Sequence, residues 1–125
     1  MIRNANSSVT MMTTSNGLIR KAEGLMPVLE KLKKKGVKVR IAAPLTKETK
    51  TTVTELGKVA DVRHTDGKAR VCIVDGKEIV FMVMNDEEVH PTYDIGIWAN
   101  TPFFANALEG MFDVAWKGMK TPQFK

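Results

Sequence analysis

The chain has 125 residues, of which 43% are hydrophobic and 26% are charged, and its formal net charge is +5. This length predicts one domain over residues 1–125, with enough apolar content for a buried core. The mildly basic balance permits anionic ligands or nucleic acid without requiring either. No apolar run approaches the roughly 20 residues of a membrane span, and the start lacks a signal-peptide core. Cys72 is the single cysteine, so no internal disulfide can form, and we expect a cytoplasmic protein without a membrane partner.

The first predicted elements are a strand and a long helix. Residues 8–14 alternate and are rich in Thr, Val and Met, which indicates the strand. From Leu18 the apolar residues recur at steps of four and three, as in an amphipathic helix, with residues 15–17 as turn or N-cap. Pro27 predicts a kink or a restart of this helix. The lysine run that precedes Gly36 fits a solvated helix end, or alternatively a phosphate-binding patch.

A second strand is predicted from Val37 to Ala43, where Pro44 ends it. The order strand, helix, strand indicates a right-handed crossover and a parallel pair. A second, more polar helix is expected to begin at Thr46 as its cap. Its threonines and Gly57 lower its helix propensity, so tertiary packing must stabilise it.

The stretch from Val62 to Asn85 is the expected centre of the sheet. Its apolar runs, residues 71–74 and 79–84, are separated by Asp75-Gly76, which is typical of a hairpin. Residues 62–64 are expected to lead into this hairpin. Both runs are apolar on both faces, so the hairpin should lie in mid-sheet with cover on each side.

The last predicted elements are a polar loop over residues 86–92, a strand over 93–99 and a helix that begins at Thr101-Pro102. We expect the apolar face of this helix to be core. It comprises Phe103, Phe104, Ala107, Leu108, Met111, Phe112, Ala115 and Trp116. The predicted fold is therefore α/β, with a mixed, largely parallel sheet and helices on both faces.

Polar residues occur at fixed intervals along the central stretch. Lys68, Arg70 and Asp75 follow the pattern K-x-R-x4-D, and Asn85 lies ten residues beyond Asp75. This pattern resembles the phospholipase D superfamily motif, H-x-K-x4-D-x6-G-S-x-N. Lys68 stands at the position of the nucleophilic His and Arg70 at that of the Lys, while Met82-Val83 replaces Gly-Ser.

The resemblance extends over most of the chain, from about Val9 to Trp116. With residues 93–97 and the C-terminal helix, the sequence is most similar to the phospholipase D-like effector domain of archaeal TrmB-type transcriptional regulators. This implies a phospholipase D-like half-domain. In such regulators a winged helix-turn-helix and a coiled coil precede the domain, so residues 1–7 could be the remnant of a connecting helix.

The resemblance also implies a site, but one without catalysis or cofactor. In the family the imidazole attacks phosphorus, whereas a lysine with an ordinary pKa of about 10.4 is protonated and cannot attack. Ligands in open α/β sheets gather at strand ends, which adds the neighbouring Asn100 and Thr101. The predicted ligand site is Lys68, Arg70, Asp75, Asn85, Asn100 and Thr101. These residues hold a sugar or an anion, or else form an ion pair kept for structure.

His64 does not restore the motif, because it stands four residues before Lys68. His64, Asp66 and His90 show no compact ligand spacing, so no metal site is predicted.

The resulting hypothesis is a non-catalytic domain that senses a small molecule and forms a homodimer. The homodimer is implied by the resemblance, since family members with one motif pair two chains. The alternatives are a divergent phosphodiesterase or nuclease, and a purely structural dimerisation module. No helix-turn-helix is recognisable, so sequence-specific DNA binding by this chain alone is not expected.

Overall fold

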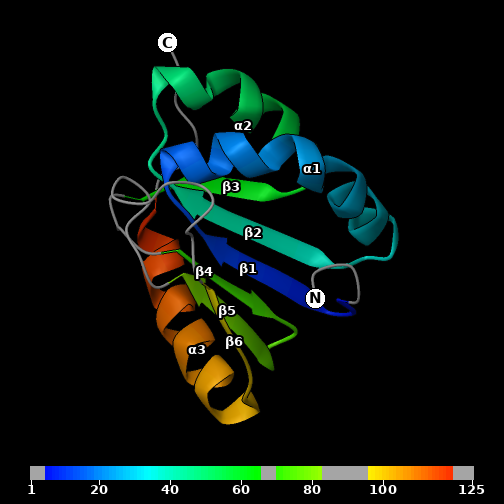
Figure 1. The fold of residues 1–125 in the computed structure, drawn as a ribbon, viewed down its shortest axis with the longest axis vertical. Coiled ribbons are helices and arrows are strands. Elements are labelled where there is room, and N and C mark those ends of the chain that lie inside the picture. The colour runs from blue at the N-terminus through cyan, green and yellow to red at the C-terminus, as the bar shows by residue number, and fades with distance from the viewer. Residues whose placement is uncertain (1–4, 66–69, 83–95, 120–125) are drawn as a thin grey trace.

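The computed structural model describes residues 5–65, 70–82 and 96–119. Its six-stranded sheet has the order β3-β2-β1-β4-β5-β6 (Figure 1). The strands are β1 (Ser8–Met12), β2 (Lys38–Ala43), β3 (Asp61–His64), β4 (Val71–Val74), β5 (Glu78–Met82) and β6 (Gly96–Asn100). β1, β2 and β3 run parallel, whereas β4, β5 and β6 join them through antiparallel pairs.

The mixed sheet with helices on both faces is confirmed, but the proportion of parallel to antiparallel strand pairs differs from the expectation. Among the described strands, two pairs are parallel and three are antiparallel, so the sheet is not largely parallel. Residues 62–64 also do not lead into the hairpin. They belong to β3, which the crossover through α2 places parallel to β2 at the far edge, while β4 pairs with β1.

The helices divide between the two faces of the sheet. α1 (Ser15–Lys34), the 3₁₀ turn η2 (Lys47–Thr49) and α2 (Lys50–Leu56) cover one face, and α3 (Pro102–Gly118) covers the other (Figure 1). α1 begins before Leu18, because the Thr14 hydroxyl accepts a hydrogen bond from the Gly17 N–H at 2.9 Å and caps it. It continues through Pro27 as one helix.

The main core lies between α1, α2 and the sheet. Its buried residues include Val9, Leu29, Leu32, Ile41, Leu56 and Val62. On the opposite face, Phe112 and Trp116 of α3 pack on Ala42, and Ala105 packs on Ile73 and Ile79. Because successive side chains of a strand point to opposite faces, one sheet contributes residues to both cores.

The expectation that all of α3's apolar face is core is wrong for part of it. Ala105, Phe112 and Trp116 are buried, but Phe103 is 88% exposed, Met111 70% and Val114 74%. A helix packed on one face of a sheet can bury only one stripe of its surface. α3 is apolar beyond that stripe.

The hairpin turn is the one predicted from Asp75-Gly76. Asp75 and Gly76 have positive φ angles of 55° and 65°, and the Lys77 N–H donates to the Val74 carbonyl at 3.0 Å. This is the backbone of a type I′ turn, whose twist suits a tight hairpin. A side chain at position 76 would meet Asn106 and Glu109 of α3 at 3.1 and 3.2 Å, so space as well as φ favours glycine there.

The Asp75 carboxylate fastens this turn to the start of β1. It accepts backbone N–H bonds from Asn6 at 3.0 Å, Ser7 at 2.7 Å and Ser8 at 3.0 Å. Partial burial by itself would raise the pKa of Asp75, but the bonds from Ser7, Ser8 and Asn6, together with Lys77, hold the pKa below its usual value. Residues 5–7 are not helical and enter β1 directly.

We predict that Asp75→Asn lowers the free energy of unfolding at pH 7 by about 1–2 kcal/mol, less than three charged hydrogen bonds would suggest because the site is partly open to water. Asparagine tolerates the positive φ, so the loss measures the charge.

The stabilisation by Asp75 should be present above the unfolded-state pKa of about 3.9 and lost as pH falls through the lower folded-state value. Urea unfolding of wild type and Asp75→Asn between pH 2.5 and 7 measures it. A stability difference that does not shrink toward the acid end would contradict this role.

Candidate functional site

A polar row lies where the parallel strands end, on the face that α1 covers. Ala43 of β2 pairs with His64 of β3, and the Thr13 N–H donates to the Ala42 carbonyl at 2.9 Å. Thr13 and Arg70 each lie two residues beyond the Met11–Cys72 pair, and therefore on the same face as it. Thr13, His64 and Arg70 thus line one edge, next to the start of α1. Carboxyl ends of parallel strands are the usual ligand position in open α/β sheets.

Arg70 is the buried charge of this row, with 6% of its surface exposed. It immediately precedes β4, so the strand fixes its backbone. A guanidinium is always charged and presents its donors in a planar fork, which suits carboxylate or phosphate oxygens. Of the two motif residues that the structure describes, Arg70 and Asp75, Arg70 lies at this edge.

Thr13 is the second element of the site. It is 1% exposed, and its hydroxyl oxygen is buried without a hydrogen-bond partner in the described part of the chain. A buried hydroxyl left unpaired costs stability, so a native one calls for an explanation. A bound ligand that hydrogen-bonds this hydroxyl would provide it.

His64 completes the row from the other side. Its Nδ1 accepts a hydrogen bond from the Leu45 N–H at 2.9 Å, which leaves the proton of the neutral ring on Nε2. Three strand spacings of about 4.8 Å separate the His64 and Arg70 backbones by about 14 Å. His64 and Arg70 could therefore contact one ligand only from opposite sides.

Of the predicted site residues that the structure describes, Arg70 lies apart from the other three. Asp75, Asn100 and Thr101 lie at the other end of the hairpin, where Glu78 pairs with Asn100 and the Thr101 N–H donates to Lys77 at 2.8 Å. Five residues of extended chain put Asp75 about 16 Å from Arg70. Asp75 is engaged by the start of β1, and Thr101 caps α3 by accepting from the Phe104 N–H. Lys68 and Asn85, as well as Asp66 and His90, lie outside the described residues.

The sequence did not lead us to Thr13, and it led us to reject His64 both as a replacement nucleophile and as a metal ligand. A signal for Thr13 was present: it follows an inward-facing strand and precedes a helix cap, which is the carboxyl end of a strand. The parallel pairing of β3 with β2, which brings His64 to the same edge, could not be read from the spacing.

The opposite face of the sheet carries a separate ionic cluster that attaches α3. Arg40 contacts Asp113 at 2.5 Å and Glu109 at 3.5 Å, and stacks on the Phe112 ring at 5.0 Å. Arg63 lies 4.4 Å from the Trp116 ring centroid and donates to the Trp116 carbonyl at 2.7 Å. These contacts give Trp116 a structural role.

The described residues contain no group of His, Cys, Asp and Glu arranged to hold a metal ion. None of their helices is long and apolar enough to cross a membrane.

Comparison with protein-family models gives no match, and comparison with curated protein sequences gives none either. Solved structures do match. They include TrmBL2, an archaeal chromatin protein described with a novel mode of DNA binding, with a TM-score of 0.70 and 13% identity over 97% of this chain. Nuc from Salmonella typhimurium, a phospholipase D family member, has a TM-score of 0.75 and 19% identity over 98% of it. NucT from Helicobacter pylori has a TM-score of 0.72 and 16% identity over 97%.

The chain has the phospholipase D fold. It spans 47% of the TrmBL2 chain and 86% of each of Nuc and NucT. The structural likeness confirms the fold that the motif implied, and at these identities it carries the fold alone.

We predict that Thr13→Val raises the free energy of unfolding by up to about 1 kcal/mol, because valine has the same shape without the unpaired hydroxyl. Thr10→Val is the matched control, since the buried Thr10 hydroxyl bonds to Arg40 at 3.1 Å and should be costly to remove. Thermal and urea unfolding of the two variants measure the difference. A Thr13→Val protein less stable than wild type would show that the hydroxyl is satisfied in the free protein.

Proposed function

We propose that this chain is a non-catalytic regulatory domain that binds a small anion or sugar at the edge formed by Thr13, His64 and Arg70. The observation that carries this proposal is a buried arginine beside a buried hydroxyl without a partner, at the carboxyl ends of the parallel strands. The proposal keeps Arg70 from the predicted ligand set. It assigns Asp75 and Thr101 to structure and leaves Asn100 at the other end of the sheet.

The chemistry of this edge favours a ligand with negative charge or several hydroxyl groups. The guanidinium offers donors to oxygen atoms, and the threonine hydroxyl can both donate and accept. α1 begins directly after this edge, and the N-terminal end of a helix favours anions.

The position of Lys68 argues against turnover. The nucleophilic position of the motif needs a neutral nitrogen near pH 7, and a lysine ammonium has no lone pair for attack on phosphorus. His64 lies on β3, with its Nδ1 occupied by the Leu45 N–H, and its sequence position does not restore the motif. We therefore propose binding without phosphodiester cleavage.

The wider role that we propose is that of the effector domain of a TrmB-type transcriptional regulator, archaeal and cytoplasmic, without a membrane partner. The structural match to TrmBL2, of which this chain spans 47%, supports it. This chain alone is not expected to recognise a DNA sequence. Lys68 and Asn85 remain proposed ligand contacts on the strength of the motif.

The ligand site predicts a thermal shift that depends on Arg70. In a screen of mono- and disaccharides, inorganic phosphate, sulfate and small carboxylates, at least one compound should raise the melting temperature of the wild-type chain. Arg70→Ala should lose at least nine-tenths of that shift. Arg40→Ala, an arginine of the opposite face, is the control and should keep it. An equal shift in Arg70→Ala and wild type would place the ligand elsewhere.

The second candidate, a divergent phosphodiesterase or nuclease, has one observation in its favour: the chain covers 86% of two structural neighbours, of which Nuc is a phospholipase D family member. Incubation with bis-p-nitrophenyl phosphate and with plasmid DNA separates the two. Hydrolysis that survives purification and disappears in Lys68→Ala would replace the binding proposal with this one.

We also propose that the chain forms a homodimer through the outer stripe of α3. Phe103, Ala107, Met111 and Val114 recur at steps of four, four and three, and are exposed. Ile97 of the edge strand β6, 45% exposed, adds further apolar surface on the face of the sheet that α3 covers, whereas Trp98 lies on the opposite face. An exposed apolar patch of this extent is typical of an interface, and a closed two-fold pair is the commonest assembly.

The dimer predicts a mass near twice the 13.9 kDa of one chain by light scattering. Met111→Glu or Val114→Glu should shift the protein to the mass of one chain, because a buried unpaired carboxylate is costly. Thr51→Glu, on the exposed side of α2, is the control. A wild-type protein that stays at one-chain mass at high concentration would reject the dimer and leave the ligand site untouched.

A further inference from the structure

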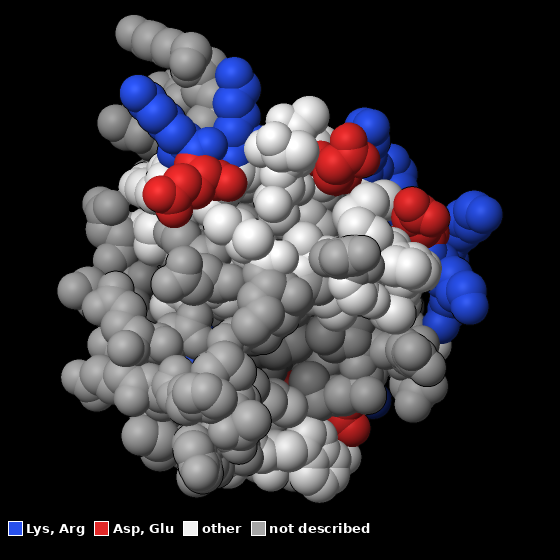
Figure 2. Space-filling model, turned by 45° about the horizontal axis from the view of Figure 1, so that its top comes forward, with Lys and Arg blue, Asp and Glu red and all other residues white. Residues whose placement is uncertain are grey.

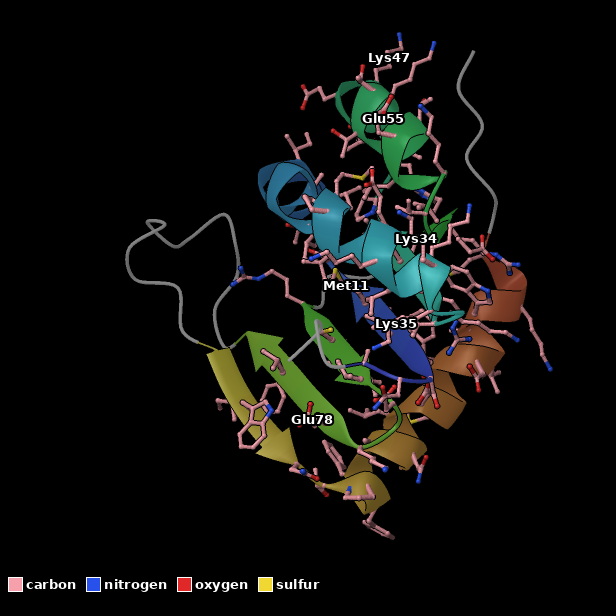
Figure 3. The ribbon with its side chains drawn as sticks, turned by 90° about the vertical axis from the view of Figure 1, so that its right-hand side faces the viewer. Met11, Lys34, Lys35, Lys47, Glu55 and Glu78 are labelled. Atoms are coloured by element: carbon pink, nitrogen blue, oxygen red, sulfur yellow. The ribbon has the colours of Figure 1, made fainter. Side chains whose placement is uncertain are left out.

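Six lysines lie at the end of the sheet opposite the ligand edge. Lys31, Lys33, Lys34 and Lys35 close α1, Lys38 opens β2, and Lys58 follows α2. Figure 3 shows Lys34 and Lys35 at the end of α1 that faces the viewer, with Lys47 well apart from them. In Figure 2 lysine and arginine side chains project at the right-hand margin, the side on which α1 ends in Figure 1, and a second group projects at the upper left; acidic side chains lie beside both groups.

Three of these lysines line a hollow in the surface. The hollow has a volume of about 780 Å³, and its walls include Lys33, Lys38 and Lys58 with the neighbouring residues 57–60. The Lys33 ammonium donates to the Lys58 carbonyl at 2.6 Å, which links the end of α1 to the turn before β3. We call this hollow, with Lys34 and Lys35 at the same helix end, the lysine groove.

Two carboxylates, Asp61 and Asp113, line the hollow together with Arg40, and each lies beside an arginine. Asp113 pairs with Arg40 at 2.5 Å, and Asp61 lies 3.9 Å from Arg63. Glu55 lies 3.4 Å from Lys58 in an exposed pair, which contributes little. Within the described part of the chain, no carboxylate lies in ion-pair distance of Lys34 or Lys38. The excess positive charge of the groove therefore rests on lysines that point into solvent.

The requirements of the helix end do not account for this arrangement. A helix C-terminus favours cations within its last turn, which explains Lys31, Lys33 and Lys34. Lys38 and Lys58 come from other elements and lie outside that turn. Convergence of lysines from three elements on one hollow points to an external anion with several charges.

We propose that the lysine groove binds the phosphate backbone of double-stranded nucleic acid, without reading its sequence. Lysine ammonium groups contact phosphates as point charges. None of the described residues that line the groove is aromatic, so it offers no ring on which unpaired bases could stack. Arg40, which also lines it, is occupied by Asp113 and Glu109 and is not available to read base edges.

The lysine groove is separate from the ligand edge. It lies at the start of β2 and β3, whereas Ala43 and His64 end these strands at the ligand edge. Five residue steps along β2 place the two about 17 Å apart. Nucleic acid could therefore occupy the groove while the ligand edge is filled or empty.

The test is fluorescence anisotropy of the full chain with a labelled 20-base-pair duplex of mixed sequence, in about 50–200 mM NaCl. The groove variant carries Lys34→Gln, Lys38→Gln and Lys58→Gln, which leaves the structural bonds of Lys33 and Lys35 intact. The control variant carries Lys47→Gln, Lys50→Gln and Lys117→Gln and has the same net charge. Circular dichroism and melting temperature confirm that both variants fold.

The wild-type chain should bind the duplex at about 50 mM salt. Its affinity should fall with salt, and the slope of log K against log salt should be smaller in magnitude by about 2–3 in the groove variant and by less than about 1 in the control variant. Arg70→Ala should bind as wild type does. Equal weakening of the two lysine variants, absence of wild-type binding at 50 mM salt, or tighter binding of a single strand than of the duplex would each overturn the proposal. Loss of duplex binding in Arg70→Ala would also overturn it and place the nucleic acid at the ligand edge.

Discussion

The register between β1 and β4 is the constraint on which the rest of this molecule depends. The Asp75 carboxylate holds the N–H groups of residues 6–8, and the Asp75 N–H donates to the Ser8 carbonyl at 2.8 Å. From this point the pairing runs Val9 with Val74 to Met12 with Val71. A slip of one residue would turn every side chain of β4 to the other face. The Asp75 clamp therefore decides that Arg70 lies beside Thr13 under α1, and that Ile73 lies under α3.

This constraint also explains why Arg70 and Asp75, two residues of the motif, lie at opposite ends of β4. A strand of four residues separates Arg70 from Asp75, so one end of the strand carries the charge that we propose contacts a ligand, and the other end carries the charge that fixes the register. Hydrogen bonds from backbone N–H groups satisfy the Asp75 carboxylate and lower its pKa, so it has little to offer a ligand. A linear motif can thus hold residues with different tasks, because spacing along a strand shows the order of side chains but not their neighbours.

Much of the fold could be predicted from local rules. The first strand, the crossover helix, the parallel second strand and the Asp75-Gly76 turn follow from periodicity, helix capping and positive φ. The position of β3 could not be predicted, because it depends on which side of β2 the chain returns after α2. The burial of α3 could not be predicted either, since eight apolar residues on one helix do not reveal which stripe meets the sheet. The candidate site could not be predicted for the same reason, because Thr13, His64 and Arg70 lie at the ends of three different strands and line one edge only in the folded sheet.

The way in which α3 is attached to the sheet affects both its own outer stripe and the lysine groove. Its inner stripe is held by Phe112 and Trp116, on which the guanidinium groups of Arg40 and Arg63 stack. Because Arg40 also pairs with Glu109 and Asp113, the acidic side chains of α3 are turned toward the sheet and its outer stripe is left almost without charge. The Arg40–Asp113 pair also engages one of the two carboxylates that line the lysine groove. The cluster that attaches α3 to the sheet therefore leaves an apolar surface suited to a second chain on one side and a basic surface suited to a polyanion on the other.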